Sequence, residues 1–262
     1  MEGNKKQSSE GHTAIALITG GSRGLGKSMA LHLADHGVDS IITYRTAANE
    51  ANDVVEAIAA KGRKAVALAL DVGRSETFEG FASTVRAALE TGWQRKDFNF
   101  LVNNAGHGGM IPFLETSEAA FDEMMKVHLK GPFFLSQRLV PLMTDGGRIL
   151  NVSSGLARFT LPGAAVYATM KGGVEVLTRY MAKELGARRI SVNTLAPGAI
   201  ATDFNGGMVR DNAQLNAHIS GQTALGRVGQ ADDIGGLVAL LLAPESHWIT
   251  GQRIEASGGM FL

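Results

Sequence analysis

Ala14-Ile-Ala-Leu-Ile-Thr-Gly-Gly-Ser-Arg-Gly-Leu-Gly26 carries the strongest indication of fold class in this chain. Its first six residues form a short apolar run that leads into glycines, as a strand buried in a parallel sheet does. Helical spacing of apolar residues begins at Gly24 and continues to His36, and Gly37 ends it. A buried strand, a glycine turn and an amphipathic helix therefore open the fold.

The alternation of strand and helix continues to the end of the chain. Further strands are expected at residues 40–44, 65–70, 99–102, 148–152, 190–195 and 253–256, and helices at residues 49–60, 76–89, 118–143, 162–185 and 232–242. Such alternation indicates an open parallel sheet covered by helices on both faces. No repeat, linker or change of composition divides residues 13–262, so we predict a single-domain, Rossmann-like, doubly wound α/β fold of about seven strands. Residues 1–12 are predicted to be a flexible polar tail.

The composition narrows the possible functions. A hydrophobic content of 45% and only 6 prolines indicate a globule with a substantial core. The formal net charge is zero, so a nucleic-acid partner is not expected. The absence of cysteine excludes disulfides, thiolate metal sites and cysteine nucleophiles. No apolar stretch is long enough to span a bilayer, and residues 1–12 lack the apolar core of a secretory signal. We expect a soluble, cytoplasmic protein.

The glycine turn after the first strand is a candidate phosphate-binding loop. Its backbone N–H groups can approach a pyrophosphate, whose negative charge the helix N-terminus favours. The spacing of Gly20, Gly24 and Gly26 is G-x-x-x-G-x-G, which differs from the usual G-x-G-x-x-G of dinucleotide folds. A plain glycine-rich turn is the alternative.

The end of the second strand indicates which dinucleotide would bind. An enzyme that uses NAD carries an acid there for the ribose 2′-hydroxyl. This chain has Tyr44-Arg45 instead, and Arg23 lies inside the glycine turn. Two guanidinium groups suit a 2′-phosphate, so NADP(H) is favoured over NAD(H). The alternative is two solvated surface arginines.

Two further strand ends carry polar residues. Asp71-Val72 ends the third strand, where the aspartate could accept a hydrogen bond from an adenine amino group or cap a turn. The segment Asn103-Asn104-Ala105-Gly106 ends the fourth strand, and its small residues would let a flat ring lie on the backbone.

A candidate catalytic pair lies on the helix that follows Pro162-Gly163. Tyr167 and Lys171 are four residues apart, so their side chains share one helix face. A neighbouring ammonium favours the phenolate, and moving the pKa of a tyrosine from ~10 to about 7 takes roughly 4 kcal/mol. The pair alone is common on helices and carries little information.

Taken together, the motifs resemble those of the short-chain dehydrogenase/reductase family over about residues 14–260. The resemblance rests on the glycine turn, Asp71, Asn103 to Gly106, Ser154, Tyr167 with Lys171, and Pro197-Gly198, all in the order typical of the family. It implies that Tyr167 is the general acid for carbonyl reduction and the general base for alcohol oxidation. It also implies that Lys171 lowers the pKa of the tyrosine and binds the nicotinamide ribose. Ser154, thirteen residues before the tyrosine, would polarise the substrate oxygen.

The resemblance further implies a set of residues that bind the cofactor. These are Gly20, Ser22, Arg23, Gly24, Leu25, Gly26, Tyr44, Arg45, Asp71, Val72, Asn104, Ala105, Gly106, Tyr167, Lys171, Pro197, Gly198, Ile200 and Thr202. Family members are commonly tetramers paired through two long helices, here residues 118–143 and 162–185, so a homotetramer or dimer is expected.

One position departs from the family pattern. Where the family has an asparagine that holds a water for the proton relay, this chain has His128. Imidazole can also donate and accept a proton, so we expect His128 to take over that catalytic role. The alternative is a packed helix residue with no part in the relay. His32 and His36 share a helix face but lack an evident third ligand, so no metal site is expected.

The predicted function is interconversion of a carbonyl (ketone, aldehyde or 3-oxoacyl type) and a secondary alcohol by hydride transfer with NADP(H). The segments expected to line the substrate pocket are residues 107–110, 155–159 and 203–219. They are mostly apolar and place no evident cation for a substrate anion, which favours a neutral substrate. Two alternatives are a non-catalytic NADP-binding sensor and an epimerase or dehydratase that reduces its cofactor transiently.

Overall fold

The computed structural model describes residues 13–262, and the predicted tail lies outside the described residues. Seven strands form one sheet: β1 (Ile15–Ile18), β2 (Asp39–Tyr44), β3 (Ala65–Ala69), β4 (Phe98–Asn103), β5 (Met143–Val152), β6 (Ser191–Pro197) and β7 (Arg253–Ala256). The strand order is β3-β2-β1-β4-β5-β6-β7, and every pair of neighbours is parallel. This confirms the predicted doubly wound α/β fold.

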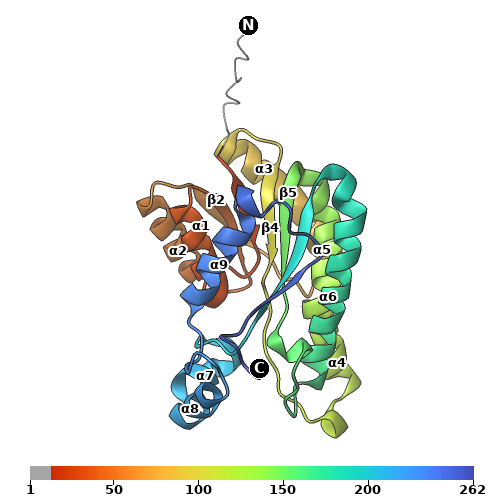
Figure 1. Ribbon diagram of the computed structural model, residues 1–262. Coiled ribbons are helices and arrows are strands. Elements are labelled where there is room, and N and C mark those ends of the chain that lie inside the picture. Colours follow the sequence, from red (N-terminus) through yellow and green to blue (C-terminus); the bar gives the residue numbers. More distant parts are fainter. Residues whose placement is uncertain (1–12) are drawn as a thin grey trace, which may run out of the picture.

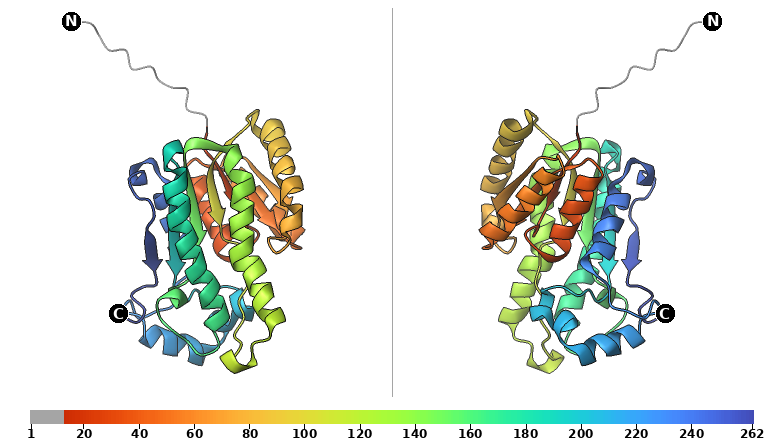
Figure 2. Two further views of the ribbon diagram at one scale, coloured as in Figure 1. Left: turned by 90° about the vertical axis from the view of Figure 1, so that its right-hand side faces the viewer. Right: turned by 90° about the vertical axis from the view of Figure 1, so that its left-hand side faces the viewer.

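Helices cover both faces of the sheet (Figure 1, Figure 2). One face carries α1 (Gly24–Asp35), α2 (Ala48–Ala60) and α9 (Ala231–Leu242), and the other carries α3 (Phe78–Trp93), α5 (Gly131–Leu139) and α6 (Ala165–Leu185). The strand period explains this division, because successive side chains point to opposite faces. Ala16 and Ile18 of β1 pack with the first group, whereas Ile15 and Leu17 pack with the second.

The prediction of one long helix at residues 118–143 is wrong in its course and its end. The segment instead consists of α4 (Glu118–Met125), a π-helical turn (Lys126–Lys130), α5, and a 3₁₀ turn (Val140–Leu142) that leads into β5. Pro132 has no N–H to donate to the carbonyl of residue 128, and the N–H of Gly131 instead donates five residues back to Lys126. Pro141 then stops the helix before the predicted Met143.

The segment after β6 contains two short helices that the sequence pattern did not indicate, α7 (Met208–Asp211) and α8 (Ala213–Gly221). The Asn212 side chain caps α8 by accepting the N–H of Leu215 at 3.0 Å. Both helices lie beyond the carboxyl ends of the strands, at the end of the molecule where the pocket was expected (Figure 1). Within residues 13–262, no helix is both long and apolar enough to cross a membrane.

Candidate active site

The glycine turn lies where the strand order reverses, because the chain leaves β1 for β2 on one side and β4 lies on the other. In open parallel sheets this is where ligands bind. Gly20 and Gly24 have φ values of +68° and +54°, which disfavour other residues. A Cβ on Gly26 would lie 2.1 Å from the carbonyl oxygen of Gly20. The turn can therefore fold back on itself only with glycine at these positions.

Side chains from neighbouring strands brace this turn. The Asn104 amide donates to the carbonyl oxygens of Thr19 (2.9 Å) and Gly20 (3.2 Å). In return, the Thr19 hydroxyl accepts the N–H groups of Asn104 (3.0 Å) and Ala105 (2.9 Å). The N–H of Gly20 donates to Thr43 Oγ1 at 3.2 Å. Asn104 thus holds the loop itself, and the bracing Thr19 was missed because it reads as the last residue of an apolar strand.

The residues around the turn fit a dinucleotide with an extra phosphate. The first turn of α1 contains no acidic residue, so its positive N-terminal end can receive a pyrophosphate. Arg23 and Arg45 are both exposed, and neither forms an ion pair within residues 13–262. Arg45 lines a hollow together with Asp71 and Arg74. Asp71 also caps a turn by accepting the N–H of Gly73 at 2.9 Å.

The segment after β6 lies opposite the glycine turn, and the two enclose a crevice at the carboxyl ends of the strands. A Cβ on Gly24 would lie 3.8 Å from the Cβ of Thr202, so Thr202 faces the glycine turn. Pro197 is the buried last residue of β6, and a Cβ on Gly198 would lie 2.8 Å from the Cα of Ser257. Ile200 pairs with Gly229 in a short bridge. The expected cofactor residues after β6 therefore converge with those after β1.

Three of the four predicted catalytic side chains come from two adjacent elements. Ser154 follows β5 and begins a 3₁₀ turn (Gly155–Ala157), where its hydroxyl accepts the N–H of Leu156 at 3.2 Å. Tyr167 and Lys171 lie in the first half of α6, and the Lys171 ammonium is 5.5 Å from the centre of the tyrosine ring. The Lys171 ammonium also donates to the carbonyl oxygen of Val152 at 2.8 Å, which fixes it against the end of β5.

Burial controls the electrostatics of this group. It raises the pKa of the Tyr167 phenol above its usual value, and the neighbouring Ser154 hydroxyl lowers that pKa in part. Burial also lowers the pKa of Lys171 to about 8, because the ammonium has lost most of its water. The lysine therefore still carries its proton at neutral pH. A cation bound in the crevice would further favour the phenolate.

His128 lies in the π-helical turn against the tyrosine. The two ring centres are 5.1 Å apart with planes at 81°, and the His107 ring lies 5.4 Å away on another side. A Cβ on Gly106 would lie 2.6 Å from His128 Cε1, so the imidazole also covers the end of β4. The side chain is 1% exposed, and neither ring nitrogen has a hydrogen-bond partner within residues 13–262. Buried polar atoms of this kind call for a water or a ligand.

Two of the segments expected to line the pocket, residues 107–110 and 203–219, meet near Tyr167. The Phe204 ring lies 6.1 Å from the tyrosine ring, and a Cβ on Gly108 would clash with the side chain of Asn205. The two arginines of the three expected lining segments are already paired, Arg158 with Glu255 and Arg210 with Asp203 and Asp211. The lining therefore presents aromatic and amide groups without an unpaired cation.

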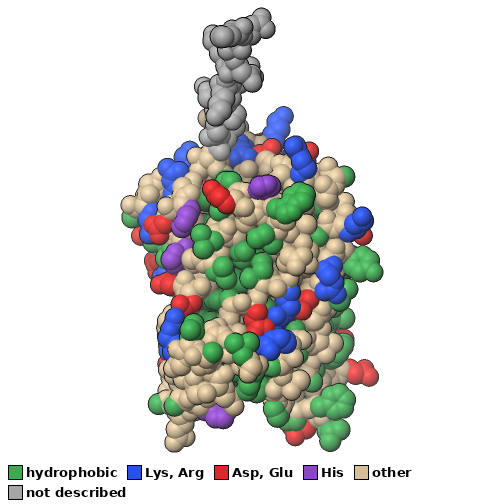
Figure 3. All heavy atoms as spheres, viewed as in Figure 1, with side chains coloured by type: hydrophobic (Ala, Val, Ile, Leu, Met, Phe, Trp, Pro, Cys, Tyr) green, Lys and Arg blue, Asp and Glu red, His purple; other side chains and the backbone are tan. Residues whose placement is uncertain are grey.

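Residues 13–262 contain no group of three or more histidine, aspartate or glutamate side chains arranged to hold a metal. His32 Nε2 lies 3.5 Å from Asp232, and His36 Nδ1 lies 2.8 Å from the His32 carbonyl oxygen. On the face shown in Figure 3, positive and negative side chains are interspersed.

Comparisons with known proteins identify the family of this chain. A family model described as enoyl-(acyl carrier protein) reductase matches residues 20–261. The 3-oxoacyl-[acyl-carrier-protein] reductase of Staphylococcus aureus is 35% identical over 252 residues, covering 95% of this chain and 99% of that protein. The structure of the promiscuous reductase LugOII, which catalyses keto-reduction at C1 during lugdunomycin biosynthesis, has a TM-score of 0.91 at 35% identity and covers 96% of this chain and 99% of that one. The angucycline C-6 ketoreductase LanV, solved with bound NADP, has a TM-score of 0.90 at 35% identity, covering 95% and 96%.

The chain therefore belongs to the short-chain dehydrogenase/reductase family, as the motifs predicted. It is an oxidoreductase that interconverts carbonyl and alcohol groups. The predicted alternatives, a non-catalytic sensor and an epimerase or dehydratase, are not favoured.

Proposed function

We propose that this enzyme reduces a neutral ketone with NADPH, using Tyr167 as the proton donor. The observation that carries the proposal is the convergence of Ser154, Tyr167 and Lys171 beside a glycine turn that excludes any side chain. The cofactor is NADP(H), as we predicted from Arg23 and Arg45. The similar protein LanV was solved with bound NADP. When bound, NADPH supplies the hydride that the protein cannot provide.

The protein's own groups would orient the ketone and move the proton. The Ser154 hydroxyl would donate a hydrogen bond to the substrate oxygen and hold it next to the Tyr167 phenol. The phenol would then give its proton to that oxygen as negative charge develops on it. The Lys171 ammonium, anchored on the Val152 carbonyl, would stabilise the resulting phenolate. The burial of Lys171 and the partial burial of Ser154 and Tyr167 would strengthen each of these interactions.

His128 would hold the water that returns a proton to Tyr167. Support comes from its two unpartnered ring nitrogens and from its contact with the tyrosine ring. Burial lowers the pKa of His128 to about 2, so the ring would act in its neutral form, with one nitrogen as donor and the other as acceptor. His128→Ala should slow turnover, whereas His128→Asn should retain most of it because an amide can also bind water. Wild-type turnover and pH profile in both variants would exclude this role.

The ion pairs of the two arginines near the pocket favour a neutral substrate. Because Arg158 and Arg210 are engaged by carboxylates, a substrate anion would have to displace an existing ion pair. LugOII catalyses keto-reduction at C1 during lugdunomycin biosynthesis, and LanV is an angucycline C-6 ketoreductase. A cyclic aryl ketone is therefore a suitable first substrate to test, and a 3-oxoacyl thioester is the second.

We infer that the enzyme works in the cytoplasm as a homotetramer or dimer. A cytoplasmic location agrees with the absence of cysteine and with the supply of NADPH that the reaction needs. Oligomerisation agrees with apolar side chains that remain exposed on α5 and α6.

The deciding experiment is an assay of NADPH oxidation with 1-tetralone, 2-tetralone and an acetoacetyl thioester. We expect stoichiometric conversion of at least one ketone to its alcohol. Tyr167→Phe should lose this activity while NADPH still binds, as measured by the change in cofactor fluorescence. Undiminished turnover in Tyr167→Phe would overturn the proposed mechanism.

A further inference from the structure

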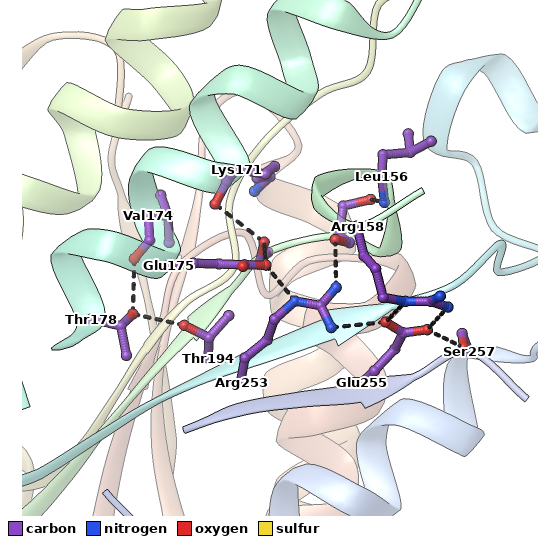
Figure 4. A network of polar contacts seen from close by, with 12 residues as sticks. Leu156, Arg158, Lys171, Val174, Glu175, Thr178, Thr194, Arg253, Glu255 and Ser257 are labelled. Atoms are coloured by element: carbon purple, nitrogen blue, oxygen red, sulfur yellow. Dashed lines mark hydrogen bonds and ion pairs between the residues drawn. The ribbon is translucent and has the colours of Figure 1, made fainter. Parts of the chain in front are cut away.

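A network of charged side chains fastens the segment that carries Ser154 to the last strand. Its members are Glu175 on α6, Arg253 and Glu255 on β7, and Arg158, which follows the 3₁₀ turn (Figure 4). Arg158 and Glu175 are far from Arg253 and Glu255 in the sequence, and the fold brings the two pairs together. Glu175, Arg253 and Glu255 are largely shielded from solvent, with side-chain exposures of 14%, 24% and 19%.

Glu255 is the centre of this network. Its carboxylate accepts two nearly parallel hydrogen bonds from Arg158, from Nε at 2.7 Å and from Nη2 at 2.6 Å. It also accepts Arg253 Nη1 at 2.8 Å and the Ser257 hydroxyl at 2.7 Å. The hydrogen bonds from Arg158 lower the pKa of Glu255 to about 2, so the carboxylate is ionised at neutral pH. Two-pronged bonds of this kind fix geometry as well as adding energy.

The network holds Ser154 from both sides. Upstream, the Ser153 hydroxyl donates to Glu175 at 2.8 Å, and Glu175 accepts Arg253 Nε at 2.7 Å. Arg253 also reaches the carbonyl oxygen of Ser154 at 3.4 Å. Downstream, Arg158 is clamped on Glu255. Ser154 itself lies between these attachments.

The 3₁₀ turn needs such support. It has only three residues, and hydrogen bonds in 3₁₀ helices have poorer geometry than those in α-helices. Arg158 anchors its far end, and its guanidinium also donates to the carbonyl oxygens of Met260 (2.8 Å) and Phe261 (3.3 Å). The Phe261 ring lies 5.0 Å from the Phe159 ring. The C-terminal segment therefore belongs to the same scaffold.

We propose that Glu255 is a positioning residue for the reduction, and that through Arg158 and Arg253 it holds the Ser154 hydroxyl in place. The inference rests on the proposed function of Ser154. Glu255 does not touch the substrate. Its effect on the reaction comes from keeping the 3₁₀ turn in one arrangement, since a small displacement of an orienting group can cost a large factor in rate.

The first test is Glu255→Gln, which keeps the shape of the side chain but removes its charge. With NADPH and the fastest ketone of the panel above, kcat should fall by about tenfold to 100-fold, while the KM for NADPH stays within twofold of the wild-type value. The matched control is Asp145→Asn, which breaks the ion pair with Arg188 near the opposite end of β5. This control should leave kcat within twofold, and an unchanged kcat in Glu255→Gln would overturn the proposal.

A double-mutant cycle separates positioning from a general loss of stability. In a Ser154→Ala background, Glu255→Gln should change kcat by less than twofold, because the group that it positions is already gone. Additive losses would show that Glu255 does not act through Ser154. Should Ser154→Ala alone retain full activity, the proposed function fails as well, so the two failures can be told apart.

Hydrogen exchange of the protein without ligands gives a readout independent of activity. Peptides covering residues 153–161 should exchange faster in Glu255→Gln than in the wild type. Asp145→Asn should leave exchange in these peptides unchanged. Equal exchange in wild type and Glu255→Gln would contradict a role in ordering the turn.

Discussion

His128 is the residue whose environment departs furthest from its solution behaviour. It is buried against aromatic rings and a glycine backbone, without a hydrogen-bond partner in the described residues. Desolvation, followed by the charges of Lys171 and His107, lowers its pKa from 6.5 to about 2. A buried imidazole of this kind lowers the free energy of unfolding in acid, because the unfolded state binds a proton that the folded state does not bind.

This difference predicts a specific acid sensitivity. Below pH 6.5 the unfolded state binds the His128 proton, whereas the folded state does not bind it until about pH 2. The unfolded state therefore carries more protons in this window, and stability falls as the pH falls. Between pH 7 and pH 5 the wild type should lose about 2 kcal/mol more free energy of unfolding than His128→Asn. Urea unfolding at the two pH values measures this, and equal losses would show that His128 titrates normally.

Cofactor choice is also decided by single residues. Arg23 and Arg45 are exposed beside the crevice, without carboxylate partners in the described residues, so a 2′-phosphate could recruit both. Since a hydrogen bond to a charged group contributes about 1.5–3 kcal/mol, Arg23→Ala with Arg45→Ala should reduce the preference for NADPH over NADH in kcat/KM by about tenfold or more. Arg86→Ala, which removes an exposed arginine from α3, is the control. A preference that survives the double substitution would place the 2′-phosphate elsewhere.

The glycine turn between β1 and α1 is the element that allows close approach to a pyrophosphate. A Cβ on Gly26 would lie 2.1 Å from the Gly20 carbonyl oxygen and 2.8 Å from the Asn104 amide that braces the turn. Gly26→Ala should therefore weaken NADPH binding by more than tenfold and destabilise the fold. Gly80→Ala in α3 is the control. Its added Cβ would have no atom within 4 Å, so this substitution should stabilise the protein by about 0.5–1 kcal/mol. Titration calorimetry and thermal unfolding check both variants, and wild-type affinity in Gly26→Ala would contradict the packing argument.

The elements that sequence reasoning could predict are those with local signals. The buried β1 run and the glycines after it lie within thirteen residues, and Tyr167 and Lys171 are one helical turn apart. Pro132 indicates that the helical hydrogen bonds are interrupted, but it does not indicate that the chain accommodates the interruption with a π-helical turn. Its course also depends on a close approach to the Val72 carbonyl, where a Cβ on Gly131 would lie 2.4 Å away.

The same distinction applies to the site. Ser154 could be assigned from its distance to Tyr167 along the chain, since the family motif fixes that spacing. Arg158 and Glu255 are 97 residues apart, and no pattern in the sequence links them. The segment at residues 203–219 was predicted only to line the pocket, without its helices, because left-handed residues such as Asn205 break its helical periodicity into short pieces.

At the scale of the whole molecule, α6 connects the site to the surface. Its first half carries Tyr167 and Lys171, and its middle exposes Val176 and Tyr180. The neighbouring α5 also exposes two apolar side chains, Phe133 and Phe134. The two helices run side by side on one flank of the molecule (Figure 2). Exposed apolar side chains on adjacent helices are typical of a subunit interface.

The assembly can be tested by placing charge on this flank. Phe134→Arg combined with Val176→Arg should reduce the mass measured by sedimentation to half or less of the wild-type value, because burying two guanidinium groups in an apolar interface is unfavourable. Ala59→Arg on the exposed side of α2 adds the same kind of charge elsewhere and should leave the mass unchanged. A wild type that sediments as a monomer at micromolar concentration, or a variant that keeps its mass, would exclude an interface here. If the interface forms, the dissociated variant should also turn over more slowly, because α6 holds Tyr167 and Lys171 at one end and would lose the partner that supports its middle.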